Sequence, residues 1–167
     1  MQFRSAVLMS SLLVGVSGGS GAQQAAGPLT QHNVSLQMAL AMAHAAMAKC
    51  KQDGFDVSVA VVDRAGELVA LLRNDNANPH NAELARRKAY TARTFRQSSL
   101  DWENGLTSKP IQQAQRDLAQ VIALGGGVPL MLGGEPIGAI GVSGSTTQDE
   151  DDLCAKAGVQ AVLEHLK

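Results

Sequence analysis

The stretch GGGVPLMLGGEPIGAIGVSGSTTQDEDD, residues 125–152, contains the signals that decide the fold. Residues 128–132 and 136–143 are two apolar runs separated by Gly133-Gly134, and a glycine pair in this position predicts a tight β-hairpin. Thr147 then precedes Glu150 by three residues, which is the spacing of a capping box, and acidic residues at this point suit the positive end of a helix dipole. We therefore expect two antiparallel strands followed by a helix that runs to about Leu166.

The chain before this stretch predicts a helix, a hairpin and further helices. Residues 34–52 place apolar side chains at helical spacing, and Gly54 ends that run. Residues 56–62 and 67–73 are strand-like and are joined by Asp63-Arg64-Ala65-Gly66, a typical hairpin turn. A second helix is expected from Asn78-Pro79 to about Gln97. Residues 98–120 predict short helical segments, interrupted at Gly105 and Pro110.

The order of these elements indicates the fold class. Residues 121–124 form one more apolar run, which we interpret as a fifth strand. The chain then reads as helix, two strands, helices, three strands and helix. Runs of strands separated from helices favour an α/β protein of the α+β type, with an antiparallel sheet and helices packed against it, over a parallel dinucleotide-binding sheet.

The first residues predict export. Arg4 precedes a short apolar run over residues 6–16, and Ser20-Gly21-Ala22 follows as a small-residue exit. This is the pattern of a signal peptide, here residues 1–22 with cleavage after Ala22, and it predicts a periplasmic or secreted protein. A Gly/Ser-rich leader on a cytoplasmic protein is the alternative. Residues 23–33 are interpreted as a tether and residues 34–167 as one domain.

Charge and cysteine content narrow the class further. The net charge is −1, from 14 basic and 15 acidic residues, so no basic field attracts nucleic acid. No later segment is apolar for long enough to span a membrane. Cys50 and Cys154 are the two cysteines, and they would form a disulfide if the first and last helices were antiparallel neighbours. Two buried free thiols are the alternative.

Several segments in register resemble the GlcG/HbpS-like family. They are VVDRAG at 61–66, ARRKAYTA at 85–92, GGVPL at 126–130, GAIGVSG at 138–144 and QDE at 148–150. The resemblance covers the chain from about Val34 to its end. It implies a profilin-like three-layer fold with a five-stranded antiparallel sheet, frequent homo-oligomers and haem binding. Many relatives have Arg-Met-Asp-Gly-Ala where this chain has Arg73-Asn74-Asp75-Asn76-Ala77, so the family's haem ligands are not transferred to these positions.

The candidate ligand-binding residues are chosen on chemical grounds. His80 lies at the start of a helix, where the dipole keeps imidazole neutral enough to bind a metal, and Glu83 follows one turn later. Alternatively, both residues lie in an exposed first turn of the helix and bind no ligand. The other histidines are less suited: His165 and His44 are interpreted as surface residues, with His44 also able to face another subunit. His32 lies in the tether.

Two cationic residues and two glycines are further candidates for ligand binding. Arg73 and Lys88 would bind haem propionates, or alternatively form surface ion pairs. Gly138 and Gly141 lie inside a predicted strand, where glycine lets either a flat ligand or another backbone approach closely. These two glycines do not belong to a dinucleotide fingerprint, because their spacing is wrong and no βαβ unit surrounds them.

Three functions follow from these residues and from the resemblance. The first is an exported module that binds haem, or a related tetrapyrrole or iron, for sensing, scavenging or storage. The second is an enzyme that degrades haem or acts on a small organic acid, with His80 and Glu83 as acid and base. The third is a structural homo-oligomer without catalysis. A classical enzyme is the less favoured of these classes.

Overall fold

The computed structural model describes residues 27–108 and 110–166 of the chain. Residues 31–167 form one compact unit. The predicted signal peptide and its cleavage site lie outside the described residues, as does the first part of the predicted tether. Residues 27–33 are exposed and have no regular secondary structure. None of the helices in the described ranges combines the length and the hydropathy that crossing a membrane requires.

A four-stranded antiparallel sheet forms the middle of the domain. Its strands are β1 (Ser58–Asp63), β2 (Leu68–Arg73), β3 (Gly127–Leu132) and β4 (Glu135–Ser143), and their spatial order is β2-β1-β4-β3. Both predicted hairpins are present, because β1 pairs with β2 and β3 pairs with β4. The long strand β4 also pairs with β1 over its second half, which joins the two hairpins into one sheet.

The predicted fifth strand at residues 121–124 is wrong: the described residues form four strands. Val121 at its start is fully buried, whereas Leu124 at its end is exposed. Its backbone groups, however, bond to side chains of α2 (Asn81–Phe95) and α3 (Ser99–Gly105) instead of to a neighbouring strand. These bonds run from Arg87 Nη2 to Val121 O, from Ile122 N to Thr91 Oγ1 and from Ser99 Oγ to Leu124 O.

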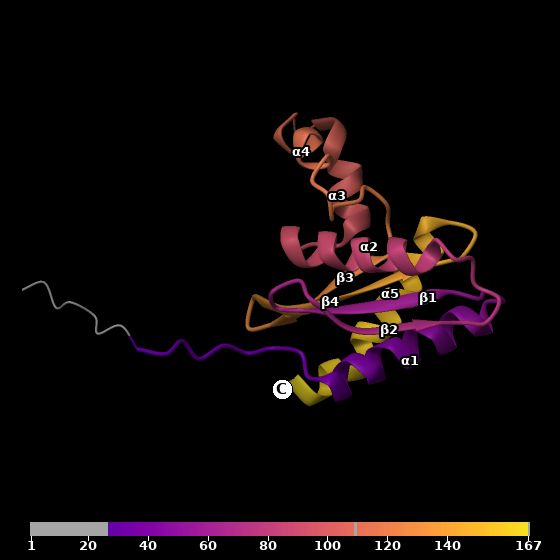
Figure 1. Cartoon of the computed structure of the whole chain (residues 1–167), viewed down its shortest axis with the longest axis horizontal. Helices are drawn as coiled ribbons and strands as arrows, with labels where there is room; N and C mark the ends of the chain where they lie inside the picture. The colour runs from indigo at the N-terminus through magenta and orange to yellow at the C-terminus, as the bar shows by residue number, and fades with distance from the viewer. Residues whose placement is uncertain (1–26, 109, 167) are drawn as a thin grey trace, which may run out of the picture. The chain divides into compact units, whose positions relative to one another are not determined.

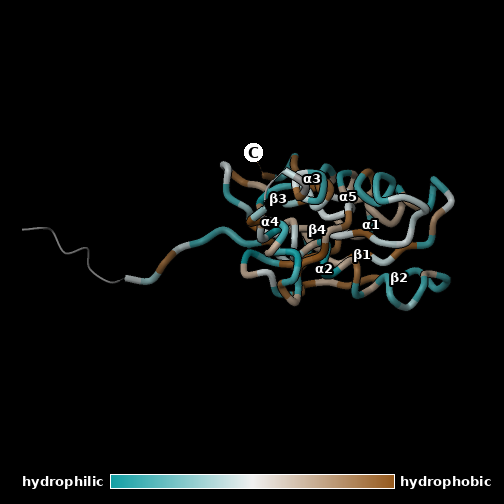
Figure 2. Tube along the Cα trace, turned by 90° about the horizontal axis from the view of Figure 1, so that it is seen from above, coloured by the Kyte–Doolittle hydropathy of each residue, from teal (hydrophilic) through white to brown (hydrophobic). Residues whose placement is uncertain are grey.

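Helices cover both faces of the sheet, which confirms the expected three layers (Figure 1). On one face, α1 (Leu36–Gln52) and α5 (Gln148–Leu163) pack against the strands. Their core contains Met42 and the inward side chains of β1 and β4, including Val59, Val61 and Ile140. The other face carries α2, and there the core is made of small residues, namely Val62, Ala89, Ala92 and Ala139. Figure 2 shows hydrophobic residues along β1 and β4, where these strands pass between the helices.

The starts of α1 and α5 follow their local sequence signals, and the start of α2 does not. Ser35 caps α1 by accepting a hydrogen bond from the Met38 N–H. Thr147 and Glu150 form the predicted capping box of α5, with both reciprocal hydrogen bonds present. The second helix, however, begins at Asn81 instead of at Asn78-Pro79, because the Asn81 N–H closes a turn onto the Asn78 carbonyl before the helix starts.

Short helices connect α2 to β3. They are α3, the 3-10 helix η1 (Leu106–Ser108) and α4 (Pro110–Gln115), and a second 3-10 helix, η2 (Glu164–Leu166), ends the described chain. Trp102 of α3 is fully buried and stacks on Phe95 with ring centroids 4.5 Å apart. Trp102 therefore packs beneath this helical segment, and tryptophan side chains are usually buried in this way.

A disulfide joins α1 to α5. The Cys50 and Cys154 sulfurs are bonded, and the two Cα atoms lie 5.6 Å apart, which is an ordinary disulfide spacing. Both residues are fully buried. The bridge forms because α1 and α5 are antiparallel neighbours, and it ties the end of α1 to the first half of α5. Of the two alternatives that the sequence leaves open for these cysteines, a disulfide and two buried free thiols, the structure contains the disulfide.

Candidate functional site between α1 and α5

The predicted pair His80 and Glu83 lies at the start of α2, on the surface. His80 is exposed and occupies the N-cap position, and its side chain makes no capping hydrogen bond. The Glu83 carboxylate accepts two hydrogen bonds from Arg86, at 3.2 Å from Nε and 3.1 Å from Nη2. Within the described residues, no three acidic, histidine or cysteine side chains gather closely enough to hold a metal ion. Glu83 is thus bound to Arg86, and a role for His80 as ligand stays a prediction.

The two predicted cations lie in different surroundings. Arg73 is exposed at the end of β2, where it is accessible to an anion. Lys88 is buried in the interior of the domain, and its side chain is 3% exposed. Its Nζ donates to Asp151 Oδ2 at 2.7 Å and to the Val142 carbonyl at 3.0 Å. A haem propionate could reach Lys88 only by displacing Asp151, so the structure gives Lys88 a structural role.

Backbone atoms of neighbouring elements lie close to Gly138 and Gly141 of β4. A Cβ atom at Gly141 would overlap the Ala85 carbonyl of α2, and a Cβ atom at Gly138 would press against the Val62 carbonyl. Of the two alternatives for these glycines, a ligand or another backbone, the structure contains the second. At Gly141 the helix leaves no room for a flat ligand.

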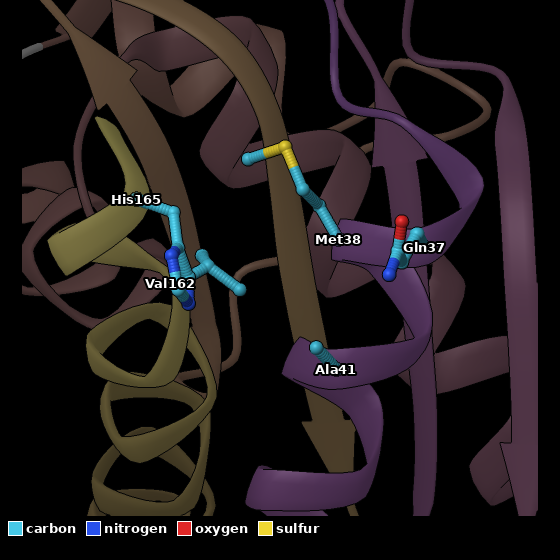
Figure 3. Close-up of a pocket in the computed structure, with 5 residues that line it drawn as sticks. All are labelled: Gln37, Met38, Ala41, Val162 and His165. Carbon is cyan, nitrogen blue, oxygen red and sulfur yellow. The ribbon is translucent and has the colours of Figure 1, made fainter. Parts of the chain in front are cut away.

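A cavity of about 320 Å³ lies between α1 and α5, at the end of the helix pair away from the disulfide. We call this cavity the α1–α5 groove. Its lining residues are Gln37, Met38 and Ala41 from α1, with Val162 from α5 and His165 from η2. Figure 3 shows the Met38 thioether extending from α1 toward the side of α5, where the His165 ring stands beside Val162. An exposed imidazole and a half-buried thioether thus line the same largely apolar hollow.

The disulfide fixes which residues meet in the α1–α5 groove. In antiparallel helices, a step toward the start of one helix matches a step toward the end of the other. Eleven residues before Cys50 is Ala39, and eleven residues after Cys154 is His165. The groove therefore follows from the register that the Cys50–Cys154 bridge imposes. The interpretation of His165 as a surface residue is confirmed, because its side chain is exposed. Its place beside Met38 could not be predicted, because it depends on that pairing.

A protein-family model matches most of this chain. The model of the HbpS-like family, described as haem degrading protein HbpS-like, matches residues 34–160. The chain belongs to the HbpS-like family. Both helices that carry the α1–α5 groove begin within the matched range, whereas His165 lies just beyond it.

Sequence and structure relatives agree with this HbpS-like assignment. Protein GlcG of Escherichia coli strain K12 is 36% identical over 110 residues, which cover 66% of this chain and 81% of GlcG. The crystal structure of HbpS superposes with a TM-score of 0.75 at 38% identity, covering 81% of this chain and 94% of that chain. A crystal structure of a PduOC–haem complex shares the fold, with a TM-score of 0.71 at 24% identity over 78% of this chain and 96% of that chain.

Proposed function

We propose that this HbpS-like protein binds haem, or a related iron tetrapyrrole, in the α1–α5 groove, for sensing, scavenging or storage outside the cytoplasm. The observation that carries this proposal is the placement of His165 and Met38 on two helices that border one apolar cavity. Histidine and methionine are side chains that ligate haem iron in proteins. Neither wall alone would offer both kinds of donor.

The groove fits such a group in its chemistry and only partly in its size. Ala41 and Val162 supply apolar surface for a flat ring, and Gln37 supplies a polar group at the rim. Ligand cavities usually measure about 300–1,000 Å³, and the 320 Å³ of this groove is at the small end. The groove would therefore enclose one part of the macrocycle and leave the remainder exposed.

Haem would supply iron-centred chemistry when bound, while the chain would hold and orient it. His165 and Met38 would hold the iron, and the apolar walls would exclude water from one side of the ring. The relatives support this class of ligand, because the family is described by haem degradation and a protein of the same fold forms a complex with haem.

Export is supported by the disulfide and by the predicted signal peptide. Disulfides persist in oxidising compartments and are rare in the cytosol, and Cys50 and Cys154 are bonded. The expected mature chain starts at Gln23. Mass spectrometry of protein recovered from the periplasm or the medium should show this start, whereas a cytoplasmic protein that retains Met1 would contradict export.

A hemin titration followed by absorbance tests the proposed site. The mature wild-type protein should give a saturable shift of the Soret band. His165→Ala and Met38→Ala should each weaken binding by about tenfold or more and change the spectrum, because an iron ligand is worth at least ~1.4 kcal/mol. His80→Ala is the matched control, since it removes an exposed histidine outside the groove, and it should bind hemin as the wild type does.

Two other outcomes of the titration would contradict the proposed site or haem binding itself. A spectrum altered by His80→Ala and unaffected by His165→Ala would move the site to the start of α2. The absence of any saturable shift would contradict haem binding altogether.

The family description favours haem degradation as a second candidate function. In that case His80 and Glu83 are the predicted acid and base, although Glu83 is held by Arg86 in this structure. Incubation with haem and a reductant distinguishes the two functions. Loss of the porphyrin spectrum, abolished by His80→Ala, would support the enzyme, and a stable spectrum would support the binding module.

A further inference from the structure

We propose that Arg64, Arg93 and Arg96 form a binding site for the phosphate group of a small molecule. We call these residues the arginine cluster. They lie where the turn between β1 and β2 meets the end of α2. The proposal goes beyond haem binding and does not depend on it, because α2 and the α1–α5 groove lie on opposite faces of the sheet.

Two contacts hold the end of α2 against the turn between β1 and β2. The Tyr90 ring packs over Gly66, where an added Cβ atom would lie 2.9 Å from it. One helical turn later, Arg93 Nε donates to the Arg64 carbonyl at 2.5 Å. Within the described residues, no group accepts a hydrogen bond from the two Nη groups of Arg93. Arg93 is thus held in place through Nε, and its Nη groups remain for an oxyanion to bind.

Like charges gather around Arg93. Arg96 follows it by three residues, directly after the end of α2, and Arg64 lies in the adjoining turn. Burial lowers the pKa of the Arg93 guanidinium, and repulsion from Arg64 and Arg96 lowers it further. Arginine nevertheless keeps its charge in proteins. An anion that binds between these cations would relieve their repulsion, which favours a negatively charged ligand.

Two acidic side chains near the arginine cluster are engaged in ways that leave room for such a ligand. Asp63 offsets part of the repulsion, but its Oδ1 accepts hydrogen bonds from the Ala65 and Glu67 N–H groups at 2.8 Å and 3.0 Å. It therefore stabilises the turn. Glu135 binds Arg64 Nη1 at 2.9 Å, and its side chain is 63% exposed. Exposed ion pairs contribute little to stability, so a phosphate displaces Glu135 at small cost.

The backbone of Arg96 supports a binding role for its side chain. Its φ is +58°, and among the described residues it is the only one other than glycine with a positive φ. Glycine usually occupies a left-handed position after a helix, because it has no Cβ atom. Backbone conformations of this unfavourable kind cluster at functional sites. Arginine is thus unfavourable for the backbone here, and its cationic side chain supplies a reason for its presence.

The number of guanidinium groups indicates a phosphate group instead of a carboxylate. One arginine side chain pairs with both oxygens of a carboxylate. A phosphate group presents three acceptor oxygens and carries a charge of about −1.5 to −2 at pH 7, so it suits several cations that approach from different directions. The arginine cluster draws on two segments, the turn and the end of α2. Inorganic phosphate and a soluble phosphate monoester share this chemistry.

A titration of the mature ¹⁵N-labelled protein, in the absence of hemin, tests the site. Inorganic phosphate or glycerol 3-phosphate should shift the amide resonances of residues 64–66 and 93–97 in a saturable way, and the tighter ligand identifies the source of the phosphate group. Acetate at equal ionic strength should bind about tenfold more weakly or worse, because it carries one charge. Shifts that do not saturate, shifts confined to other residues, or acetate binding as tight as phosphate binding would overturn the proposal.

Substitutions distinguish the arginine cluster from general charge effects. Arg93→Gln should weaken phosphate binding about tenfold or more, because it removes hydrogen bonds from a charged donor. Arg116→Gln is the matched control, since Arg116 is an exposed arginine after α4, and it should bind phosphate as the wild type does. Equal weakening by both substitutions, or unchanged binding by Arg93→Gln, would contradict the site.

Arg96→Gly separates binding from a structural role. Glycine suits the left-handed conformation, so the variant should keep or raise the midpoint of urea denaturation. Its affinity for phosphate should nevertheless fall, because one cation of the arginine cluster is lost. A lower midpoint with unchanged phosphate affinity would show that Arg96 is structural and would overturn its part in the site.

Discussion

At the scale of single residues, Lys88 and Asp151 form an ion pair inside the domain, and both side chains are almost fully buried. Asp151 also accepts hydrogen bonds from the Ser145 N–H at 3.1 Å and from the Ser145 hydroxyl. The pair therefore connects α2 to the start of α5. Removing one member of such a pair leaves an uncompensated charge in the interior, which costs far more than the loss of a surface pair.

Lys88→Met should accordingly lower the free energy of unfolding by about 3–5 kcal/mol. Lys49→Met is the control, because Lys49 pairs with Asp53 at the exposed surface of α1 and should cost about 0–1 kcal/mol. Urea denaturation followed by circular dichroism measures both. Equal effects of the two substitutions would show that the interior pair is not structural.

Asp56 makes a prediction about acid stability. A hydrogen bond from Lys51, with a second from Asn76, holds the pKa of its carboxyl below the usual 3.8. Because the folded pKa is the lower one, this carboxylate stabilises the fold above pH 3.8, and its contribution is lost as pH falls through the folded value. Asp56→Asn should reduce the decline of the unfolding free energy below that pH. Urea denaturation of the wild type and of Asp56→Asn at a series of pH values measures this difference.

The candidate residues show how far a sequence alone can lead at this scale. The position of His80 at the start of a helix could be predicted because a helix start is a local signal, and the structure confirms that position. Its role as a ligand stays a prediction. The bonding of Glu83 to Arg86 was missed, because a carboxylate on a helix has several side chains within reach. Lys88 was predicted to bind a haem propionate or to form a surface ion pair, since nothing local indicates that Asp151, 63 residues later, lies beside it.

At the scale of elements, the contact between α2 and the sheet depends on Gly141. A methyl group there would overlap the Ala85 carbonyl and press on the Ala89 N–H of α2. Gly141→Ala should therefore destabilise the protein by about 3 kcal/mol or more, because inserted atoms in a packed interface force the backbone apart. Gly133→Asn is the control: this turn glycine has open space around it and a φ of +57°, which asparagine tolerates. Thermal or urea unfolding compares the two.

The disulfide between α1 and α5 should be a major source of stability. Cys50 and Cys154 are 104 residues apart in sequence. In the chain-entropy description, closing a loop of this length lowers the entropy of the unfolded chain and raises its free energy by about 4–5 kcal/mol. The double variant Cys50→Ala, Cys154→Ala should lose most of that amount in urea denaturation. If the loss were below about 1 kcal/mol, the bridge would not be what holds the two helices in register.

Elements with local signals were predicted well, and those defined by distant partners were not. The capping box at Thr147 and the glycine turn of the β3–β4 hairpin are encoded within a few residues, so their positions were found. Residues 121–124 resemble a buried strand in composition alone, and only the side chains of Arg87, Ser99 and Thr91 reveal that they lie outside the sheet. The α1–α5 groove needs the register of two helices that are about 100 residues apart.

At the scale of the whole molecule, the sheet separates two different regions. On one side α2 packs closely through small residues, which leaves no space for a ligand against Gly141. On the other side α1 and α5 are joined by the disulfide at one end and leave the groove at the other. The antiparallel α+β architecture therefore places the proposed haem site and the start of α2 on opposite faces of the sheet.

The most direct test of this account is a map of where hemin binds in solution. Ferric haem is paramagnetic and broadens the amide resonances of nearby residues, and zinc protoporphyrin serves as the diamagnetic control. With the mature protein labelled with ¹⁵N, hemin should broaden the resonances of residues 37–41 and 162–166 and leave those of residues 80–83 sharp. Broadening that is confined to residues 80–83, with the groove residues unaffected, would contradict the account.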